Sequence, residues 1–361
     1  MPRLRRLSLC LGCTIILSPL TGCARPVPLP TRRAERAPTI VFTGDILLAG
    51  RAERLIEEKG TGAPFAGVSE VVREADLAIG NLECAISTRG KPADKSYTFR
   101  ADPNAARALS ETGFDIVDLA NNHSVDYGQE GLRDTLSALS AAGVGAVGAG
   151  GDAEGARQPA LIRAGEPPIT IALLAFSNMQ PTIFYAGAHR PGTNPAHPDA
   201  IRQSVAAARG QADSVIAMFH WGDERSTLPS ARQRELARIA VDAGADLVVG
   251  HHPHVLQGFE RRGDALIAYS IGNFLFPSRG ESRMTMILRY TPERDGSARL
   301  EVIPAVIEGF QPRLADAKEA GDCLGRLRAL SARLGAELLD SKGVITSPAR
   351  AASVDKARTP P

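Results

Sequence analysis

The chain has 361 residues, of which 43% are hydrophobic and 23% charged, an ordinary globular composition with room for one large or two smaller domains. Its formal net charge of +2 and its scattered arginines argue against nucleic acid as a partner. Of its five cysteines only Cys84 and Cys323 lie beyond residue 23, which excludes a disulfide framework and a thiolate metal site. We expect these two to be separate buried thiols.

The N-terminus has the pattern of a lipoprotein signal peptide, residues 1–22. A basic start at residues 3–6 precedes an apolar stretch at 7–17, about half of the ~20 residues that a membrane span needs. Leu20-Thr21-Gly22-Cys23 then resembles a bacterial lipobox, in which the cysteine carries lipid. The alternative is an ordinary signal peptide that ends near a cysteine. The first interpretation predicts an exported protein, held at the inner or outer membrane by lipid on Cys23.

Residues 23–38 are rich in proline and arginine, and we expect them to form a flexible tether. The folded part, residues 39–312, then alternates strands with helices. In its first half we expect strands at 39–42, 77–80, 116–119 and 144–147, and helices at 51–59, 67–74, 104–112 and 129–142. In its second half we expect strands at 160–163, 170–176, 215–219 and 247–249, and a helix at 231–243.

Three later β-rich runs lack intervening helices and should pair as antiparallel strands: 266–270, 284–290 and 299–305. Residues 178–200 should form a long loop without regular structure. A helical segment at 313–340, with its helix at 315–339, and a disordered tail at 341–361 complete the expected chain. The pattern predicts an α/β fold with antiparallel additions.

Five short polar motifs each follow an apolar, β-rich run: TGD at 43–45, GNLE at 80–83, ANNH at 120–123, FHWGDE at 219–224 and GHHPH at 250–254. The carboxyl ends of strands are where an α/β sheet places its active site. Carboxylate, amide and imidazole donors without thiolates suit divalent metals such as Mn, Mg, Fe or Zn. The candidate ligands are Asp45, Glu83, Asn122, His220, His252 and His254. Six donors exceed the needs of one zinc ion and predict two metal ions, the arrangement that serves phosphoryl transfer.

Other polar residues of these motifs are candidates for catalysis or support. His123 is left free to donate a proton, and Asp126, three residues on, could hold its tautomer. In an extended backbone His252 and His254 would point the same way. Candidate substrate contacts or supporting residues are Asn81, Trp221, Glu224, His251, Arg190 and Asn273. Each motif alone also has an ordinary explanation, as a turn, a helix cap or a core histidine.

The motifs as a set, GD…GNLE…ANNH…D…HWG-x-E…GHHPHV-x-Q…SIGNF with RPGT at 190–193, resemble the CapA family of bacterial capsule or poly-γ-glutamate synthesis proteins. The resemblance spans roughly residues 39–312. That family is related to the calcineurin-like metallophosphoesterases, which implies a four-layer α/β/β/α sandwich with mixed sheets and a dinuclear site. Asp45 matches the superfamily's first aspartate, Asn122-His123 its Asn-His pair, His220 its lone strand-end histidine, and His252-Pro253-His254 its His-x-His.

The chain departs from the superfamily pattern at two positions. Ile46-Leu47 stands where an Asp-x-His motif would supply a histidine, and Glu83 stands where a bridging aspartate is usual. The resemblance implies a lipid-anchored protein for synthesis or export of an anionic capsule polymer, with a metal-dependent hydrolase-type site. The missing histidine favours a second hypothesis, a non-catalytic partner of a membrane polymer synthase. A third hypothesis is a phosphoesterase for another envelope substrate.

Overall fold

The computed structural model describes residues 37–336 and 339–348. The predicted signal peptide, the lipidation site Cys23, nearly all of the tether and the end of the tail lie outside these residues. Among the described helices, none combines the length and the apolar character that crossing a bilayer requires.

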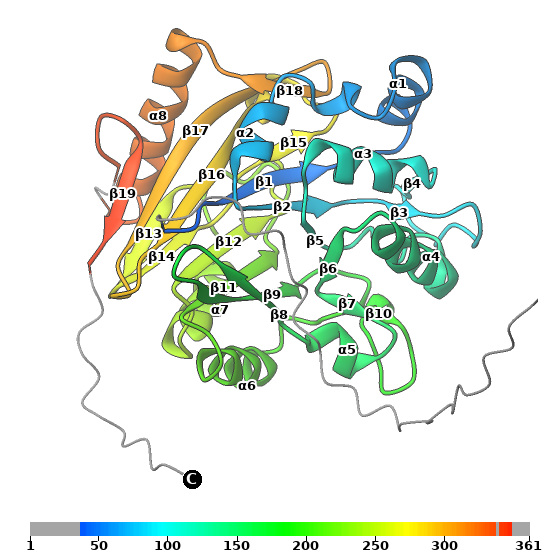
Figure 1. Cartoon of the computed structure of the whole chain (residues 1–361), viewed down its shortest axis with the longest axis horizontal. Helices are drawn as coiled ribbons and strands as arrows, with labels where there is room; N and C mark the ends of the chain where they lie inside the picture. Colours follow the sequence, from blue (N-terminus) through cyan, green and yellow to red (C-terminus); the bar gives the residue numbers. More distant parts are fainter. Residues whose placement is uncertain (1–36, 337–338, 349–361) are drawn as a thin grey trace, which may run out of the picture.

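The larger of the two main sheets contains nine strands (Figure 1). Its parallel part is β1 (Ile40–Ile46), β2 (Leu77–Leu82), β5 (Ile116–Asp118), β6 (Gly145–Val147) and β15 (Asn273–Leu275). Its antiparallel part is β16 (Met284–Pro292), β17 (Ala298–Glu308), β18 (Gln311–Leu314) and β19 (Val344–Ser347). The sheet is therefore mixed, with the parallel strands β2, β5 and β6 on one side of β1, and with β15 and the antiparallel strands on the other.

The smaller sheet has six strands in the order β13-β14-β12-β11-β9-β8. The central strands β9 (Ile169–Ser177), β11 (Ser214–His220), β12 (Leu247–His251) and β14 (Ala265–Ala268) are parallel. The edge strands β8 (Ala160–Ala164) and β13 (Phe259–Arg262) are antiparallel to their neighbours. Two short pairs, β3 (Ala85–Ile86) with β4 (Arg100–Ala101) and β7 (Ala149–Gly150) with β10 (Gly192–Thr193), join loops.

Three hydrophobic cores separate four layers. Because strand side chains alternate between faces, Phe42 of β1 packs between the two sheets while Val41 faces the helices outside. The outer helices of the large sheet are α1 (Arg51–Lys59), α2 (Ser69–Glu74), α3 (Asn104–Thr112) and α4 (Gly128–Ala141). Those of the small sheet are α6 (Pro198–Arg209) and α7 (Ala231–Asp242), which Figure 1 shows on the opposite side of the molecule. The expected α/β/β/α sandwich is present.

The C-terminal segment packs against the sandwich and contributes to its core. Helix α8 (Ala317–Ala332) places Cys323 and Leu327 in the core between the sheets. The helix begins at Asp316, whose side chain accepts from the Glu319 amide in a capping box, and it ends well before the predicted residue 339. The thiols of Cys84 and Cys323 are buried and separate, as predicted.

Three expectations about strands and loops were wrong. The strand at 266–270 pairs with β12 and β13 in the small sheet, not with β16 or β17, because a β-rich run predicts a strand but not its partner. The stretch 178–200 contains a 3₁₀ turn at Thr182–Phe184, strand β10 and the start of α6, while α5 (Ala153–Arg157) precedes it. The predicted tail forms strand β19 at Val344–Ser347, where Ile345 is buried against β17.

Candidate metal centre

The carboxyl ends of the parallel strands bring five motifs together. β1 pairs with β2 and β15, so that Asp45 lies opposite both Asn81 and Asn273. In the other sheet β11 ends at His220, opposite His251 of β12. Glycine is required at Gly44, since a Cβ there would lie 2.0 Å from the Gly272 carbonyl oxygen. The glycine of TGD therefore permits the close approach that sets Asp45 beside Asn273.

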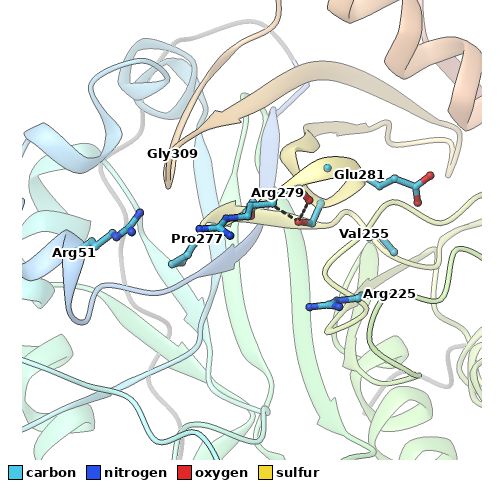
Figure 2. Close-up of a pocket in the computed structure, with 10 residues that line it drawn as sticks. Arg51, Arg225, Val255, Pro277, Arg279, Glu281 and Gly309 are labelled. Carbon is cyan, nitrogen blue, oxygen red and sulfur yellow. Dashed lines mark hydrogen bonds between the residues drawn. The ribbon is translucent and has the colours of Figure 1, made fainter.

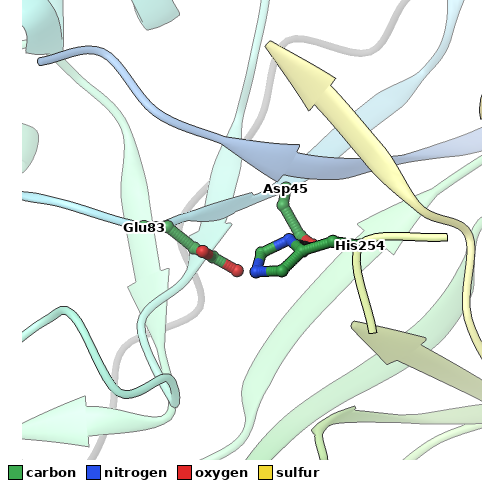
Figure 3. Close-up of side chains that lie close together, drawn as sticks. All are labelled: Asp45, Glu83 and His254. Carbon is green, nitrogen blue, oxygen red and sulfur yellow. Dashed lines mark ion pairs between the residues drawn. The ribbon is translucent and has the colours of Figure 1, made fainter. Parts of the chain in front are cut away.

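Asp45, Glu83 and His254 form the centre of the site. Figure 3 shows the three side chains pointing toward one another from the ends of β1, β2 and β12. One ligand atom from each lies within 4.8 Å of the others. His254 Nδ1 lies 3.0 Å from Asp45 Oδ2, and both carboxylates are fully buried. This spacing and donor set fit a divalent cation.

His220, Asn122 and His252 extend the cluster on the side of Glu83. His220 Nε2 lies 2.8 Å from Asn122 Oδ1 and 3.6 Å from Glu83 Oε1. The His252 ring lies 4.9 Å from the His220 ring and 5.5 Å from the His254 ring, between centroids. The structure thus gathers all six predicted ligands into one connected group.

Asn81 links the two sides of this group. Its Nδ2 donates to Asp45 Oδ1 at 2.8 Å and to Glu83 Oε1 at 3.0 Å, and lies 3.2 Å from His220 Nδ1. The predicted supporting role of Asn81 thus corresponds to direct contacts with three candidate ligands. Asn273 supports a fourth, because its Oδ1 lies 2.8 Å from His254 Nδ1.

Burial and the charges of neighbouring groups shift the pKa values of the side chains in the cluster. Burial, with the nearby Asp45, raises the pKa of Glu83 well above its usual range. Burial works against a charged His254, but the facing carboxylates of Glu83 and Asp45 raise its pKa to about 10. Burial, together with the other imidazoles, lowers the pKa of His252 to about 3 and that of His220 well below normal. Neutral imidazoles of this kind are the form that binds metal.

Buried polar atoms without hydrogen-bond partners give independent evidence that the cluster binds a ligand. Glu83 Oε2, His252 Nδ1 and His251 Nδ1 are buried without a hydrogen-bond partner in the described structure. Such atoms are rare in folded proteins because each costs about 1–3 kcal/mol. The adjacent Cys84 adds no thiolate, since burial raises the pKa of its thiol to about 12. The residues present therefore fit a divalent metal bound through oxygen and nitrogen.

The backbone of the GHHPH motif differs from the extended form that we expected. Strand β12 ends at His251, and His252 and His254 have φ values of 93° and 59°. Positive φ is uncommon for non-glycine residues and clusters at functional sites. Both rings reach the cluster through this turn rather than through alternation along a strand. His251 lies behind them, with its Nε2 3.3 Å from the Thr43 carbonyl oxygen.

His123 lies beside the cluster and is held through one ring nitrogen. Its Nδ1 is 2.8 Å from Asp126 Oδ2, the contact that their spacing predicted. The sequence interpretation missed Lys95, whose Nζ lies 2.6 Å from Asp126 Oδ1 and 3.3 Å from His123 Nδ1. The ring also packs on Phe99 at 4.5 Å. Burial lowers the pKa of His123 despite the contact with Asp126.

Asn121 organises the turn that carries Asn122 and His123. Its Nδ2 donates to Asn81 Oδ1 and to the Leu82 carbonyl oxygen. Its Oδ1 accepts from the amides of His123 and Ser124 and from the Ser124 hydroxyl. We assigned a role only to the second asparagine of ANNH, although the first makes more contacts.

Three predicted contact residues do not reach the cluster. Trp221 was expected to pack beside the site or to stack on a substrate ring. Its ring is fully buried under α7, stacks on Phe219 at 4.4 Å and donates to the Tyr269 carbonyl oxygen. Glu224 is exposed on the following turn. Arg190 is exposed and donates to the Tyr185 carbonyl oxygen within its own loop. Trp221 therefore has no surface to offer a substrate.

Comparison with known proteins identifies close relatives. A family model described as "Bacterial capsule synthesis protein PGA_cap" matches residues 39–278. PGA biosynthesis protein CapA of Bacillus subtilis (strain 168) is 34% identical over 274 residues, 75% of this chain and 72% of that protein. Capsule biosynthesis protein CapA of Bacillus anthracis is 34% identical over 300 residues, with 79% and 71% covered.

Two weaker likenesses accompany these matches. A Mycobacterium tuberculosis protein named "Probable polyglutamine synthesis accessory protein" is 28% identical over 279 residues, 72% of this chain and 73% of that protein. The crystal structure of TT1561 of Thermus thermophilus covers 70% of this chain and 94% of its own at 12% identity. Its TM-score of 0.38 is too low to establish a common fold.

Proposed function

The chain belongs to the bacterial capsule synthesis protein family PGA_cap, and we propose that it serves the synthesis or export of an anionic capsule polymer such as poly-γ-glutamate. The names of its relatives in Bacillus and Mycobacterium, which refer to capsule, PGA and polyglutamine synthesis, support this role. Within it, the buried cluster acts as a metal-dependent hydrolase-type site.

One observation carries the proposal of a metal site. Six nitrogen and oxygen donors converge from five strand ends, and Glu83 Oε2 among them has no hydrogen-bond partner in the described structure. Asp45, Glu83 and His254 would hold one divalent ion, and His220, His252 and Asn122 would complete a second position. Bound ions of this kind, Mn, Fe, Zn or Mg, would polarise a phosphoryl or carbonyl oxygen.

The protein's own residues supply the proton transfer. In the protonated ring, the Nδ1–H of His123 donates to Asp126 Oδ2, which leaves the Nε2–H to give its proton to the substrate's leaving group. Asp126 is itself fixed by the Phe99 amide at 2.7 Å and by Lys95. His123 is therefore held in one orientation and needs no large movement to act.

His123→Ala should lower turnover strongly and leave metal binding intact. We expect a fall of about 100-fold or more, the usual contribution of a positioned acid or base. The measurement compares hydrolysis of poly-γ-glutamate and of a chromogenic phosphodiester, together with metal content. His189→Ala, which removes an exposed histidine of another loop, is the matched control. Equal turnover in native protein and His123→Ala would remove His123 from the mechanism.

A second candidate function is a non-catalytic partner of a membrane polymer synthase. It is favoured by Leu47, which takes the place of a ligand histidine and is buried in the outer core, only 7% exposed. No turnover by the metal-loaded native protein on either substrate, with retained binding to the polymer, would favour this function. A phosphoesterase for another envelope substrate predicts turnover of the phosphodiester alone.

We also propose that lipid on Cys23 anchors the protein in the cell envelope. The basic start, the short apolar stretch and the lipobox-like Leu20–Cys23 support export and lipidation. Cys23→Ser should move the protein from the membrane fraction to the soluble fraction of cells, while Cys84→Ser, a buried thiol, should not. A native chain found only in the soluble fraction would contradict the anchor.

A further inference from the structure

A cavity of about 640 Å³ next to the metal cluster is lined by three arginines. Arg51 begins α1 just after β1, Arg225 follows β11, and Arg279 lies in the segment between β15 and β16. Figure 2 shows Arg51 and Arg225 approaching the cavity from opposite sides, with Arg279 between them. Neither the sequence motifs nor the mechanism above uses these residues.

The lining of this arginine cavity is positively charged, with three arginines and one acidic residue. None of the three guanidinium groups contacts a carboxylate in the described part of the chain. The one acidic lining residue, Glu281, is paired with Arg326 at 2.9 Å, and Figure 2 shows it directed away from the arginines. Unpaired cations around a concave surface concentrate positive potential and attract anions. Guanidinium groups also match the planar carboxylate.

The arginine cavity is connected to the metal cluster by direct contacts. Ser278, in its wall, accepts from Asn273 Nδ2 at 2.9 Å, and Asn273 Oδ1 lies 2.8 Å from His254 Nδ1. On the other side, the Arg225 amide donates to the Pro253 carbonyl oxygen at 2.7 Å, within the histidine motif itself. The wall of the arginine cavity is therefore joined to the metal ligands through Asn273 and Pro253, which places the two sites next to each other.

We propose that the arginine cavity is a binding subsite for successive carboxylates of a polyanionic chain, whose neighbouring segment lies at the metal cluster. The identity of that chain as the capsule polymer rests on the proposed function. A repeating carboxylate ligand fits because the guanidinium groups come from three separate segments and face a space much larger than one small anion. A single phosphate would fill only a small part of this space.

The test is binding of a short, fluorescent γ-linked glutamate oligomer to the metal-free full chain. The triple variant Arg51→Gln/Arg225→Gln/Arg279→Gln should bind about 50-fold more weakly, at about 3–5-fold for each exposed ion pair. Arg133→Gln removes an exposed arginine on α4, outside the cavity, and should change affinity less than about twofold. Equal affinity of the triple variant and the native chain would overturn the proposal.

Two further arms identify the ligand chemistry. An oligomer whose free α-carboxylates are amidated should not bind, and inorganic phosphate should displace the unmodified oligomer only at concentrations that act through ionic strength. Displacement by phosphate at low concentration, lost in the triple variant, would assign the cavity to a phosphate group and contradict the carboxylate subsite.

This binding test can succeed or fail independently of the test of the proposed function, because it needs neither metal nor turnover. Weak binding by the triple variant would support the subsite even if the native protein hydrolysed nothing. Unchanged binding, with turnover intact in the native protein, would remove the subsite and leave the catalytic proposal standing.

Discussion

Glu83→Gln should stabilise the metal-free protein and remove most of the stability that it gains from metal. Glu83 is fully buried, its Oε2 has no hydrogen-bond partner in the described structure, and burial raises its pKa well above normal. Neutralising this group relieves a penalty of about 1–3 kcal/mol in the metal-free fold. The same change removes a metal ligand, and even residues that only orient ligands are worth about 10–100-fold in affinity.

Calorimetric unfolding with chelator and with excess Mn²⁺ measures both effects. We expect the variant to melt above the native protein in chelator and below it in Mn²⁺. Glu224→Gln is the matched control, because Glu224 is an exposed carboxylate near the same site, and it should follow the native protein in both conditions. A variant that is less stable without metal, or equally stabilised by Mn²⁺, would show that Glu83 is a structural carboxylate.

Asn121→Ala should be the most destabilising single change in the site. Its amide makes five hydrogen bonds at 1% exposure, to Asn81, Leu82, His123 and Ser124. With about 0.5–1.5 kcal/mol for each bond and buried partners left unsatisfied, we expect a loss of about 3–5 kcal/mol. The turn that presents Asn122 and His123 would lose its anchor at the same time.

Urea unfolding at equilibrium gives this loss, with Asn122→Ala as the control. Asn122 is only partly buried and contacts His220, so its removal should cost about 1 kcal/mol. If Asn121→Ala does not fold, Asn121→Asp keeps the acceptor oxygen and should show an intermediate loss. Asn121→Ala no less stable than Asn122→Ala would contradict the organising role.

The sequence predicted the candidate ligands well because buried parallel strands have a distinctive pattern. β2, β11 and β12 are apolar on both faces, so each reads as a continuous run that ends at a polar motif. Parallel strands place those ends at one edge of each sheet. The packing of the two sheets against each other then brings Asp45 and His220 into one group, linked through Asn81. The family matches confirm the resemblance that these motifs predicted.

Other features depend on contacts between distant segments and left little trace in the sequence. Lys95 lies in a polar loop without periodicity, and it becomes significant only when that loop meets Asp126. The pairing of β14 with β12 and the formation of β19 beside β17 both depend on strands that are distant in sequence. Trp221 was assigned to the site because it follows His220 in sequence. Neighbouring side chains of an extended segment point to opposite faces, so the Trp221 ring packs in the outer core instead.

The most direct test of the account is the metal content of the native full chain, purified without a histidine tag and compared with Glu83→Gln. The account predicts about two divalent ions per native chain, with binding weakened in the variant. A native chain that binds no divalent metal at all would contradict it, and the cluster would then be a buried polar network without a metal-dependent function.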